Sequence, residues 1–285
     1  MPELHCEEQL SGETSARNNM NSVPPRVPPV GMTSNPNSPT FVYDPLPLHW
    51  QMTRCEKFCF ASLVEFAKAD VAIEIGTYKG GSLQVISSRA KKVYSLDINP
   101  DCKEQLGHRF PNVEFRTGDS NKMIASVLEN IRNNGEKLGF VLIDGDHTTD
   151  GVRCDINAVL KHVPDRPVYI VFHDSFHPPC REGILQADWQ QCPYIHFVEV
   201  DFIPGVFHYK PFDTAVARSM YGGLAVALML PEKREGPLAI HQSQQGLFDV
   251  VFQNSCHAPP KQEEPKLLTR IRRKLGAVKR RLIGG

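Results

Sequence analysis

A glycine-bearing turn between an apolar strand and a helix is the first part of this sequence that could bind a ligand. Residues 71–82 read Val-Ala-Ile-Glu-Ile-Gly-Thr-Tyr-Lys-Gly-Gly-Ser, so an apolar run leads into Glu74 and the turn begins at Gly76. Glycines in such a turn let a ligand approach the backbone closely. A second apolar run, residues 92–97, ends in Asp97, about twenty residues past the turn, where an acid is placed to bind a ribose diol.

The spacing of the glycines argues against a dinucleotide cofactor. A dinucleotide fingerprint would place glycines at positions 76, 78 and 81, but residue 78 is a tyrosine. The missing glycine is the one that lets a pyrophosphate approach the helix N-terminus. A diphosphate cofactor therefore fits this turn poorly.

Acids and histidines follow two later apolar runs, and they predict a second chemical centre. Residues 140–147 read Phe-Val-Leu-Ile-Asp-Gly-Asp-His, and residues 169–174 read Tyr-Ile-Val-Phe-His-Asp. Asp144 and Asp174 would stand at neighbouring strand ends, where two carboxylates repel unless a proton or a cation lies between them. Oxygen ligands in such a place suit Mg²⁺. His147 could take a proton from a substrate hydroxyl.

The pattern Glu-x-Gly-x-x-x-Gly-Gly-Ser resembles motif I of the class I S-adenosylmethionine-dependent methyltransferases. The resemblance implies that the turn wraps the amino-acid end of the cofactor, that Asp97 holds the ribose and that residues 119 and 120 face the adenine. The alternative is a tight strand-to-helix turn in another α/β protein. The predicted cofactor-binding residues are Glu74, Gly76, Thr77, Tyr78, Gly81, Ser82, Asp97, Asp119, Ser120 and Asp144.

Asp119 and Ser120 have a second interpretation. Either residue could cap the helix predicted over residues 121–132, because both types are favoured at helix N-termini. Capping and cofactor contact do not exclude each other, so both stay open here.

The acids and histidines at residues 144–147 and 173–174 resemble one branch of these enzymes, and the resemblance covers roughly residues 50–230. That branch holds metal-dependent O-methyltransferases of sugars and natural products, together with cephalosporin-hydroxylase-like proteins. By position, Asp144, His173 and Asp174 would be the metal ligands and His147 the general base. Residue 173 is usually an acid in that branch. His173 would favour Mn²⁺, Fe²⁺ or Zn²⁺ relative to Mg²⁺, or it would orient Asp174 without binding the metal.

The elements that must position these residues alternate along the chain. Apolar runs predict strands near residues 71–75, 92–97, 112–115, 139–144, 167–172, 196–202 and 222–230. Helical spacing predicts helices near residues 50–68, 81–90, 101–108, 121–132, 150–161, 181–190 and 244–253. Such alternation predicts an α/β fold: a Rossmann-like, seven-stranded, mostly parallel sheet with helices on both faces. The resemblance implies an antiparallel seventh strand.

Composition and charge narrow the classes of function. The chain has 285 residues, of which 41% are hydrophobic and 22% charged, and its formal net charge is zero. The whole chain therefore has no bulk attraction to nucleic acid or to a membrane. The eight cysteines form no C-x-x-C pair, which indicates reduced cysteines in a cytoplasmic protein rather than a zinc or disulfide framework.

The sequence predicts four parts. Residues 1–40 are rich in Pro, Asn and Ser and are expected to be disordered. Residues 41–232 would be the methyltransferase domain, and residues 233–260 a C-terminal extension. Residues 261–285 carry nine Lys or Arg and two Glu, a net charge of +7, with an apolar stripe at helical spacing. This basic amphipathic helix would contact an anionic membrane through residues 266–285 or dock on the domain or a second subunit. Nucleic acid is not expected as a partner.

The combined prediction is an S-adenosylmethionine-dependent O-methyltransferase, assisted by a divalent metal (Mg²⁺ or Mn²⁺). Its acceptor would be a hydroxyl of a sugar, a glycan or a small natural product. Two alternatives stay open: a hydroxylase-like oxidoreductase on the same scaffold, and a non-catalytic, membrane-attached cofactor-binding module. A homo-oligomer is compatible with the sequence.

Overall fold

The computed structural model describes residues 48–208 and 217–260. The predicted disordered segment, residues 1–40, and the predicted basic helix, residues 261–285, lie outside the described residues. The described part holds an eight-stranded sheet of order β10-β6-β9-β5-β4-β1-β2-β3 and a hairpin of β7 and β8. The strands are β1 (Val71–Ile75), β2 (Lys92–Asp97), β3 (Val113–Thr117), β4 (Leu138–Ile143), β5 (Val168–His173), β6 (Ile195–Ile203), β7 (Val206–His208), β8 (Ser219–Tyr221), β9 (Leu224–Met229) and β10 (Ile240–His241).

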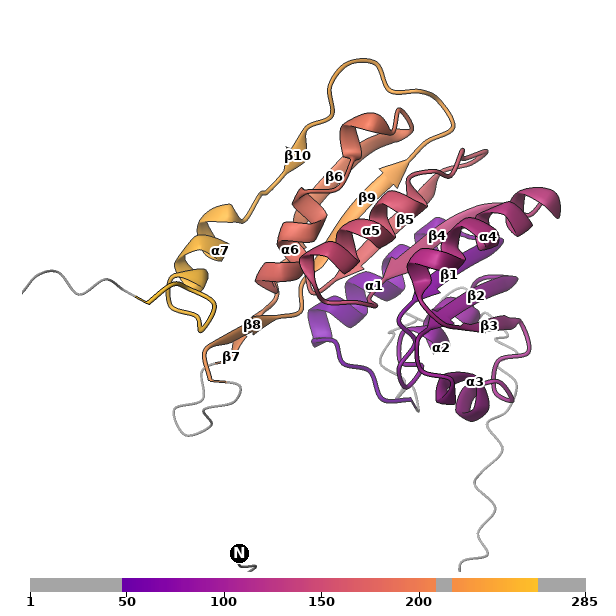
Figure 1. Cartoon of the computed structure of the whole chain (residues 1–285), viewed down its shortest axis with the longest axis horizontal. Coiled ribbons are helices and arrows are strands. Elements are labelled where there is room, and N and C mark those ends of the chain that lie inside the picture. Colours follow the sequence, from indigo (N-terminus) through magenta and orange to yellow (C-terminus); the bar gives the residue numbers. More distant parts are fainter. Residues whose placement is uncertain (1–47, 209–216, 261–285) are drawn as a thin grey trace, which may run out of the picture. The chain divides into compact units, whose positions relative to one another are not determined.

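Helices cover both faces of the sheet (Figure 1). One apolar core joins α4, α5 and α6 to one face, and a second core joins α1, α2 and α3 to the other face. The helices are α1 (Arg54–Ala67), α2 (Leu83–Ser87), α3 (Asp101–Leu106), α4 (Ser120–Asn133), α5 (Thr149–Val159), α6 (Pro178–Leu185) and α7 (Gln245–Phe252), with a 3₁₀ turn at Trp189–Gln191.

The predicted mostly parallel sheet is confirmed, including its antiparallel strand. β9 pairs antiparallel with both β5 and β6, whereas the remaining pairs of this sheet are parallel. The sequence did not predict β10 or the β7–β8 hairpin. These strands are two or three residues long, too short to show an alternating pattern.

The central strands are buried on both faces, which explains their nearly continuous apolar sequences. All five residues of β1 and all six of β4 are buried. Ile73 and Ile75 pack toward α4, α5 and α6, whereas Ala72 packs toward α1, α2 and α3. Successive side chains of a strand point to opposite faces, so a strand covered on both sides needs apolar residues at nearly every position.

Strand register brings the predicted site residues together. Ile75 pairs with both Leu96 and Ile143, and Ile143 pairs with Phe172. The residues that end or directly follow these four strands therefore meet at one edge of the sheet: Gly76, Asp97, Asp144 and His173.

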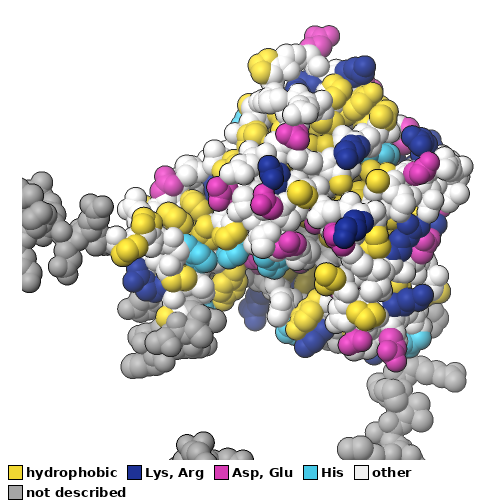
Figure 2. Space-filling model, viewed as in Figure 1, with side chains coloured by type: hydrophobic (Ala, Val, Ile, Leu, Met, Phe, Trp, Pro, Cys, Tyr) yellow, Lys and Arg dark blue, Asp and Glu magenta, His cyan; other side chains and the backbone are white. Residues whose placement is uncertain are grey.

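The surface carries charges of both signs. Figure 2 shows basic and acidic side chains interspersed on the face drawn there, in keeping with the zero formal net charge of the chain. Among the helices within residues 48–208 and 217–260, none combines the length and the apolar character that a membrane crossing requires.

Glu74 is a fully buried acid in the central strand β1. Its Oε1 accepts a hydrogen bond from the Ser82 hydroxyl at 2.6 Å, and its Oε2 accepts one from the Ser95 hydroxyl at 3.2 Å. Burial raises the pKa of Glu74 to about 8, although the two serine hydroxyls oppose this shift. The carboxyl is therefore largely protonated at neutral pH, and it ties the start of α2 to the sheet through Ser82.

Replacing Glu74 by Gln should flatten the dependence of stability on pH. The folded-state pKa lies above the ordinary value of 4.5, so the folded chain binds the proton more tightly than the unfolded chain. The unfolding free energy of the wild type then falls as the pH rises from about 4.5 to about 8. Gln cannot ionise, and it can accept from Ser82 and donate to Ser95. We expect Glu74→Gln to match the wild type at about pH 4.5 and to be about 4–5 kcal/mol more stable at about pH 9, because each tenfold difference in proton affinity between the folded and unfolded chain corresponds to about 1.4 kcal/mol.

Urea unfolding across this pH range measures the difference between the two proteins. Glu65→Gln, at an exposed position of α1, is the control and should leave the pH slope unchanged. Parallel stability curves for the wild type and Glu74→Gln would contradict the prediction.

Candidate active site

A cavity of about 880 Å³ lies at the carboxyl edge of the sheet. Proteins commonly bind small ligands in pockets of about 300–1,000 Å³. Glu74 does not line this cavity. It lies beneath the glycine turn and binds Ser82, which does line the cavity. The other predicted site residues all line it: Gly76, Thr77, Tyr78, Gly81, Ser82, Asp97, Asp119, Ser120, Asp144, His147, His173 and Asp174.

The turn after β1 needs its glycines because other backbone segments approach it closely. Gly76 has a φ of +86°, and a Cβ there would collide with the carbonyl oxygen of Asp144. A Cβ at Gly81 would meet the backbone of His49 and Trp50. Tyr78 has a φ of +47° without being a glycine. Such left-handed residues cost about 1–2 kcal/mol and cluster at binding sites.

Asp97 holds the glycine turn in place. Its Oδ2 accepts hydrogen bonds from the backbone N–H of Thr77 at 2.8 Å and of Tyr78 at 2.9 Å, and its Oδ1 accepts one from Asn99 at 2.8 Å. An ionised carboxylate has about four acceptor positions. Roughly one position is therefore left for a ligand, which suits one strong hydroxyl contact.

Asp119 caps α4, and both Asp119 and Ser120 line the cavity. The Asp119 side chain accepts a hydrogen bond from the N–H of Asn121 at 3.1 Å. The Ser120 hydroxyl donates to Asp155 Oδ1 at 2.6 Å, and Asp155 is fully buried. The capping interpretation is confirmed for Asp119, and the adenine contact stays a prediction.

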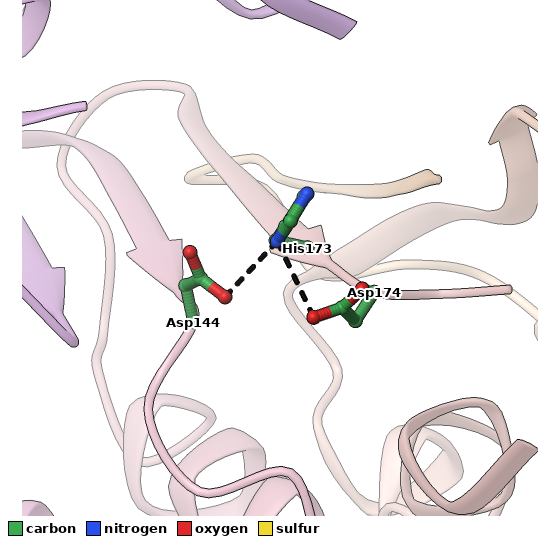
Figure 3. A group of neighbouring side chains, drawn as sticks. All are labelled: Asp144, His173 and Asp174. Carbon is green, nitrogen blue, oxygen red and sulfur yellow. Dashed lines mark hydrogen bonds and ion pairs between the residues drawn. The ribbon is translucent and has the colours of Figure 1, made fainter. Parts of the chain in front are cut away.

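Asp144, His173 and Asp174 converge at the ends of β4 and β5 (Figure 3). His173 Nδ1 lies 3.1 Å from Asp144 Oδ1 and 3.5 Å from Asp174 Oδ2. Asp174 has a φ of +57°, and its Oδ1 accepts a hydrogen bond from the N–H of Gly222. The backbone of Asp174 thus departs from extended geometry where its carboxylate turns toward the imidazole.

The charges of this cluster shift the pKa values of His173 and Asp144 strongly. Burial opposes the charged form of His173, but the carboxylates of Asp144, Asp174 and Glu56 outweigh burial and raise its pKa to about 10. Burial likewise opposes the ionised form of Asp144, but His173 and His147 lower its pKa to about 2. The cluster therefore favours a positive charge between its carboxylates.

His147 stands above the two acids, and its side chain is 48% exposed. Its Nε2 lies 3.3 Å from Asp144 Oδ1, and its Nδ1 lies 3.5 Å from Asp174 Oδ2. The hydrogen bond to Asp144 raises the pKa of His147, against the effect of burial. Thr148, which follows His147, caps α5 by accepting a hydrogen bond from the N–H of Gly151.

The donor set at the ends of β4 and β5 fits a divalent ion. One ligand atom from each of Asp144, His173 and Asp174 lies within 4.8 Å of the others. Neighbouring ligands at about 2.1 Å in an octahedron are about 3.0 Å apart, close to the 3.1 Å between His173 Nδ1 and Asp144 Oδ1. Two carboxylates and one imidazole suit Mn²⁺, Fe²⁺ or Zn²⁺, as well as Mg²⁺.

Two features of the site are not predicted by the sequence pattern. One is Glu56, which is 1% exposed and lies 4.0 Å from His173 Nε2 through its Oε1. The other is the stretch of residues 49–52, which lines the cavity. The Thr-x-x-Glu pattern at residues 53–56 is a capping-box signature that predicts the start of α1. It does not predict that Glu56 is buried beside a histidine.

Sequence comparisons agree with this geometry. Residues 73–175 match the family model described as a methyltransferase domain, and this range contains all the predicted site residues. An uncharacterized protein of Acanthamoeba polyphaga mimivirus is 30% identical over 122 residues, which cover 38% of this chain and 53% of that protein. The chain thus spans about half the length of this curated relative.

Structural comparisons find O-methyltransferases among the similar solved structures. An O-methyltransferase from Bacillus cereus, in complex with SAH, is 16% identical with a TM-score of 0.45, covering 62% of this chain and 82% of that one. A second similar structure is that of the O-methyltransferase TomG from Streptomyces achromogenes, involved in tomaymycin synthesis, in complex with SAM. It is 13% identical with a TM-score of 0.44, and the match covers 60% of this chain and 78% of that one. Residues 73–175 thus match a methyltransferase domain, and they lie within the mostly parallel, Rossmann-like sheet described above.

Proposed function

We propose that this chain transfers a methyl group from S-adenosylmethionine to a hydroxyl oxygen of a sugar, a glycan or a small natural product, with the help of a divalent metal ion. One observation carries the proposal. A single cavity is lined on one side by the glycine turn and Asp97, and on another by Asp144, His147 and Asp174. A cofactor held at the turn would therefore share the cavity with a group that can accept a proton.

The cofactor side of the cavity is built from backbone and one carboxylate. Gly76 keeps the floor of the turn free of a side chain, and Asp97 retains roughly one acceptor position for a ribose hydroxyl. S-adenosylmethionine supplies a methyl group on a positively charged sulfur. The protein then has to hold the acceptor oxygen in line with that carbon, which is largely a positioning task.

His147 is the group best placed to receive the proton of the acceptor hydroxyl. It is the most exposed member of the cluster, and both ring nitrogens face carboxylates, Asp144 on one side and Asp174 on the other. These contacts orient the imidazole over the cavity. Asp144, His173 and Asp174 would hold the divalent ion, which lowers the pKa of a bound hydroxyl and fixes its direction.

The predicted contact of residues 266–285 with an anionic membrane remains a proposal about a segment outside the described residues. Such a contact would suit a glycan or lipid-linked acceptor, because it would hold the domain near acceptors at a membrane surface.

The first test concerns the cofactor. We expect S-adenosylmethionine or S-adenosylhomocysteine to bind in the micromolar range, about −8 kcal/mol. Asp97→Ala should weaken binding at least about tenfold, because the turn loses its anchor and the ribose its acceptor. Titration calorimetry measures both effects. Asp101→Ala, which changes an exposed acid of α3 outside the cavity lining, is the matched control. Tight NAD binding without adenosylmethionine binding would refute the cofactor assignment.

The second test concerns the base. His147→Ala should lower turnover about 10²–10⁴-fold, because the acceptor proton loses its recipient, and should leave cofactor affinity nearly unchanged. Product formation from labelled cofactor, measured on a panel of hydroxyl acceptors, gives the rate. His241→Ala, on the exposed edge strand β10, is the control. Full turnover in His147→Ala together with a loss in His177→Ala would move the role to His177.

The third test concerns the metal. A chelator should lower activity, and Mg²⁺ or Mn²⁺ should restore it, because the ion neutralises the two acids and polarises the acceptor. Asp174→Asn should lose this activation. Asn can keep the Oδ1 contact with the N–H of Gly222, so cofactor affinity should persist. Turnover that is unaffected by chelation in the wild type would show that the reaction needs no metal.

A further inference from the structure

We propose that Glu56 is a positioning residue of the metal site. Its carboxylate holds the proton of His173 on Nε2, so that Nδ1 presents its lone pair to a divalent ion between Asp144 and Asp174. The inference rests on the metal-assisted function proposed above, and it assigns a role to a residue on a helix remote in sequence from the other members of the site.

The two ring nitrogens of His173 face different partners. Nδ1 faces the carboxylates of Asp144 and Asp174, at 3.1 and 3.5 Å. Nε2 points away from them; it is buried and has no hydrogen-bond partner among the described residues. Its ionic neighbour is Glu56 Oε1, at 4.0 Å. A shift of about 1 Å would turn this contact into a charge-assisted hydrogen bond.

Two consecutive backbone N–H groups, of Gly222 and Gly223, bind the carboxylates of Asp174 and Glu56. The N–H of Gly222 donates to Asp174 Oδ1, and the N–H of Gly223 donates to Glu56 Oε1. Both glycines have left-handed φ values, +72° and +84°. A Cβ at Gly222 would lie 2.7 Å from Glu56 Oε1. The turn that enters β9 is therefore shaped to place one carboxylate on each side of His173.

Helix capping does not by itself account for the position of Glu56. Its Oε2 accepts a hydrogen bond from the N–H of Thr53 at 2.5 Å, which completes the capping box of α1. A capping box needs this contact but no burial, and an acid that is 1% exposed loses most of its hydration. The neighbouring imidazole of His173 offers a reason for that burial, because a proton on its Nε2 faces the Glu56 carboxylate.

Metal-binding histidines commonly donate their second ring N–H to a carboxylate or a carbonyl. This contact fixes the tautomer, orients the ring and raises its basicity, and its removal typically costs about 10–100-fold in metal affinity. A nitrogen ligand prepared in this way favours Mn²⁺ over Mg²⁺. Glu56 would thus help set the metal preference of the site, although it touches neither the ion nor the acceptor.

Calorimetric titration of the full chain with Mn²⁺, in the absence of cofactor, tests the role of Glu56. We expect Glu56→Gln to lower Mn²⁺ affinity about 10–100-fold and to affect Mg²⁺ less. Thr53→Ala is the matched control: it removes the hydroxyl that accepts from the N–H of Glu56, leaves the Glu56 carboxylate in place, and should keep wild-type Mn²⁺ affinity. Thermal unfolding of both variants shows whether weakening the capping box of α1 lowers the stability of Glu56→Gln and of Thr53→Ala by the same amount.

Three results would overturn the assignment. These are unchanged Mn²⁺ affinity in Glu56→Gln, an equal loss in Thr53→Ala at matched stability, or no Mn²⁺ binding by the wild type. A separate titration with S-adenosylmethionine keeps the two proposals distinguishable. Absent cofactor binding would refute the methyltransferase proposal, whereas a metal affinity that depends on Glu56 would still support the positioning role.

Discussion

Three carboxylates surround one buried imidazole at the carboxyl edge of the sheet, and much of the site depends on this arrangement. Asp144 and Asp174 directly follow β4 and β5, Glu56 lies in α1, and each approaches His173. Like charges so close together are tolerated only with a compensating positive charge. A protonated imidazole or a bound cation can supply it. In this arrangement a proton on His173 meets that requirement, and the proposed divalent ion would meet it instead.

This requirement for positive charge links distant parts of the chain. Gly222 and Gly223 precede the antiparallel strand β9, and their amides bind Asp174 and Glu56. β9 pairs with β5, with His173 opposite Leu224, so the pairing of these strands sets the position of the amides. The same strand pairing that completes the sheet thus also orients two acids of the site.

The cofactor side and the acidic side of the cavity share one backbone junction. The N–H of Asp144 donates to the carbonyl of Ile75 at 2.8 Å, and Gly76 lies against the Asp144 carbonyl with no room for a side chain. A displacement of the glycine turn would therefore move Asp144 as well. This contact gives a physical route by which a ligand at the turn could alter the position of the acids.

The resemblance to class I methyltransferases implied the antiparallel strand β9. The sequence alone determined the order of the longer elements, the mostly parallel sheet and the strand-end residues that line the cavity. These features follow from apolar periodicity and from acids placed directly after apolar runs, both of which are local in sequence. The tertiary structure decided three contacts. Glu74 lies beneath the glycine turn and binds Ser82, Asp97 accepts most of its hydrogen bonds from the turn and from Asn99, and Glu56 lies beside His173. The pattern Thr53-x-x-Glu56 predicts a helix start, but the burial of Glu56 depends on how α1 packs against the sheet. Contacts between residues far apart in the chain arise from that packing, and no local pattern encodes them.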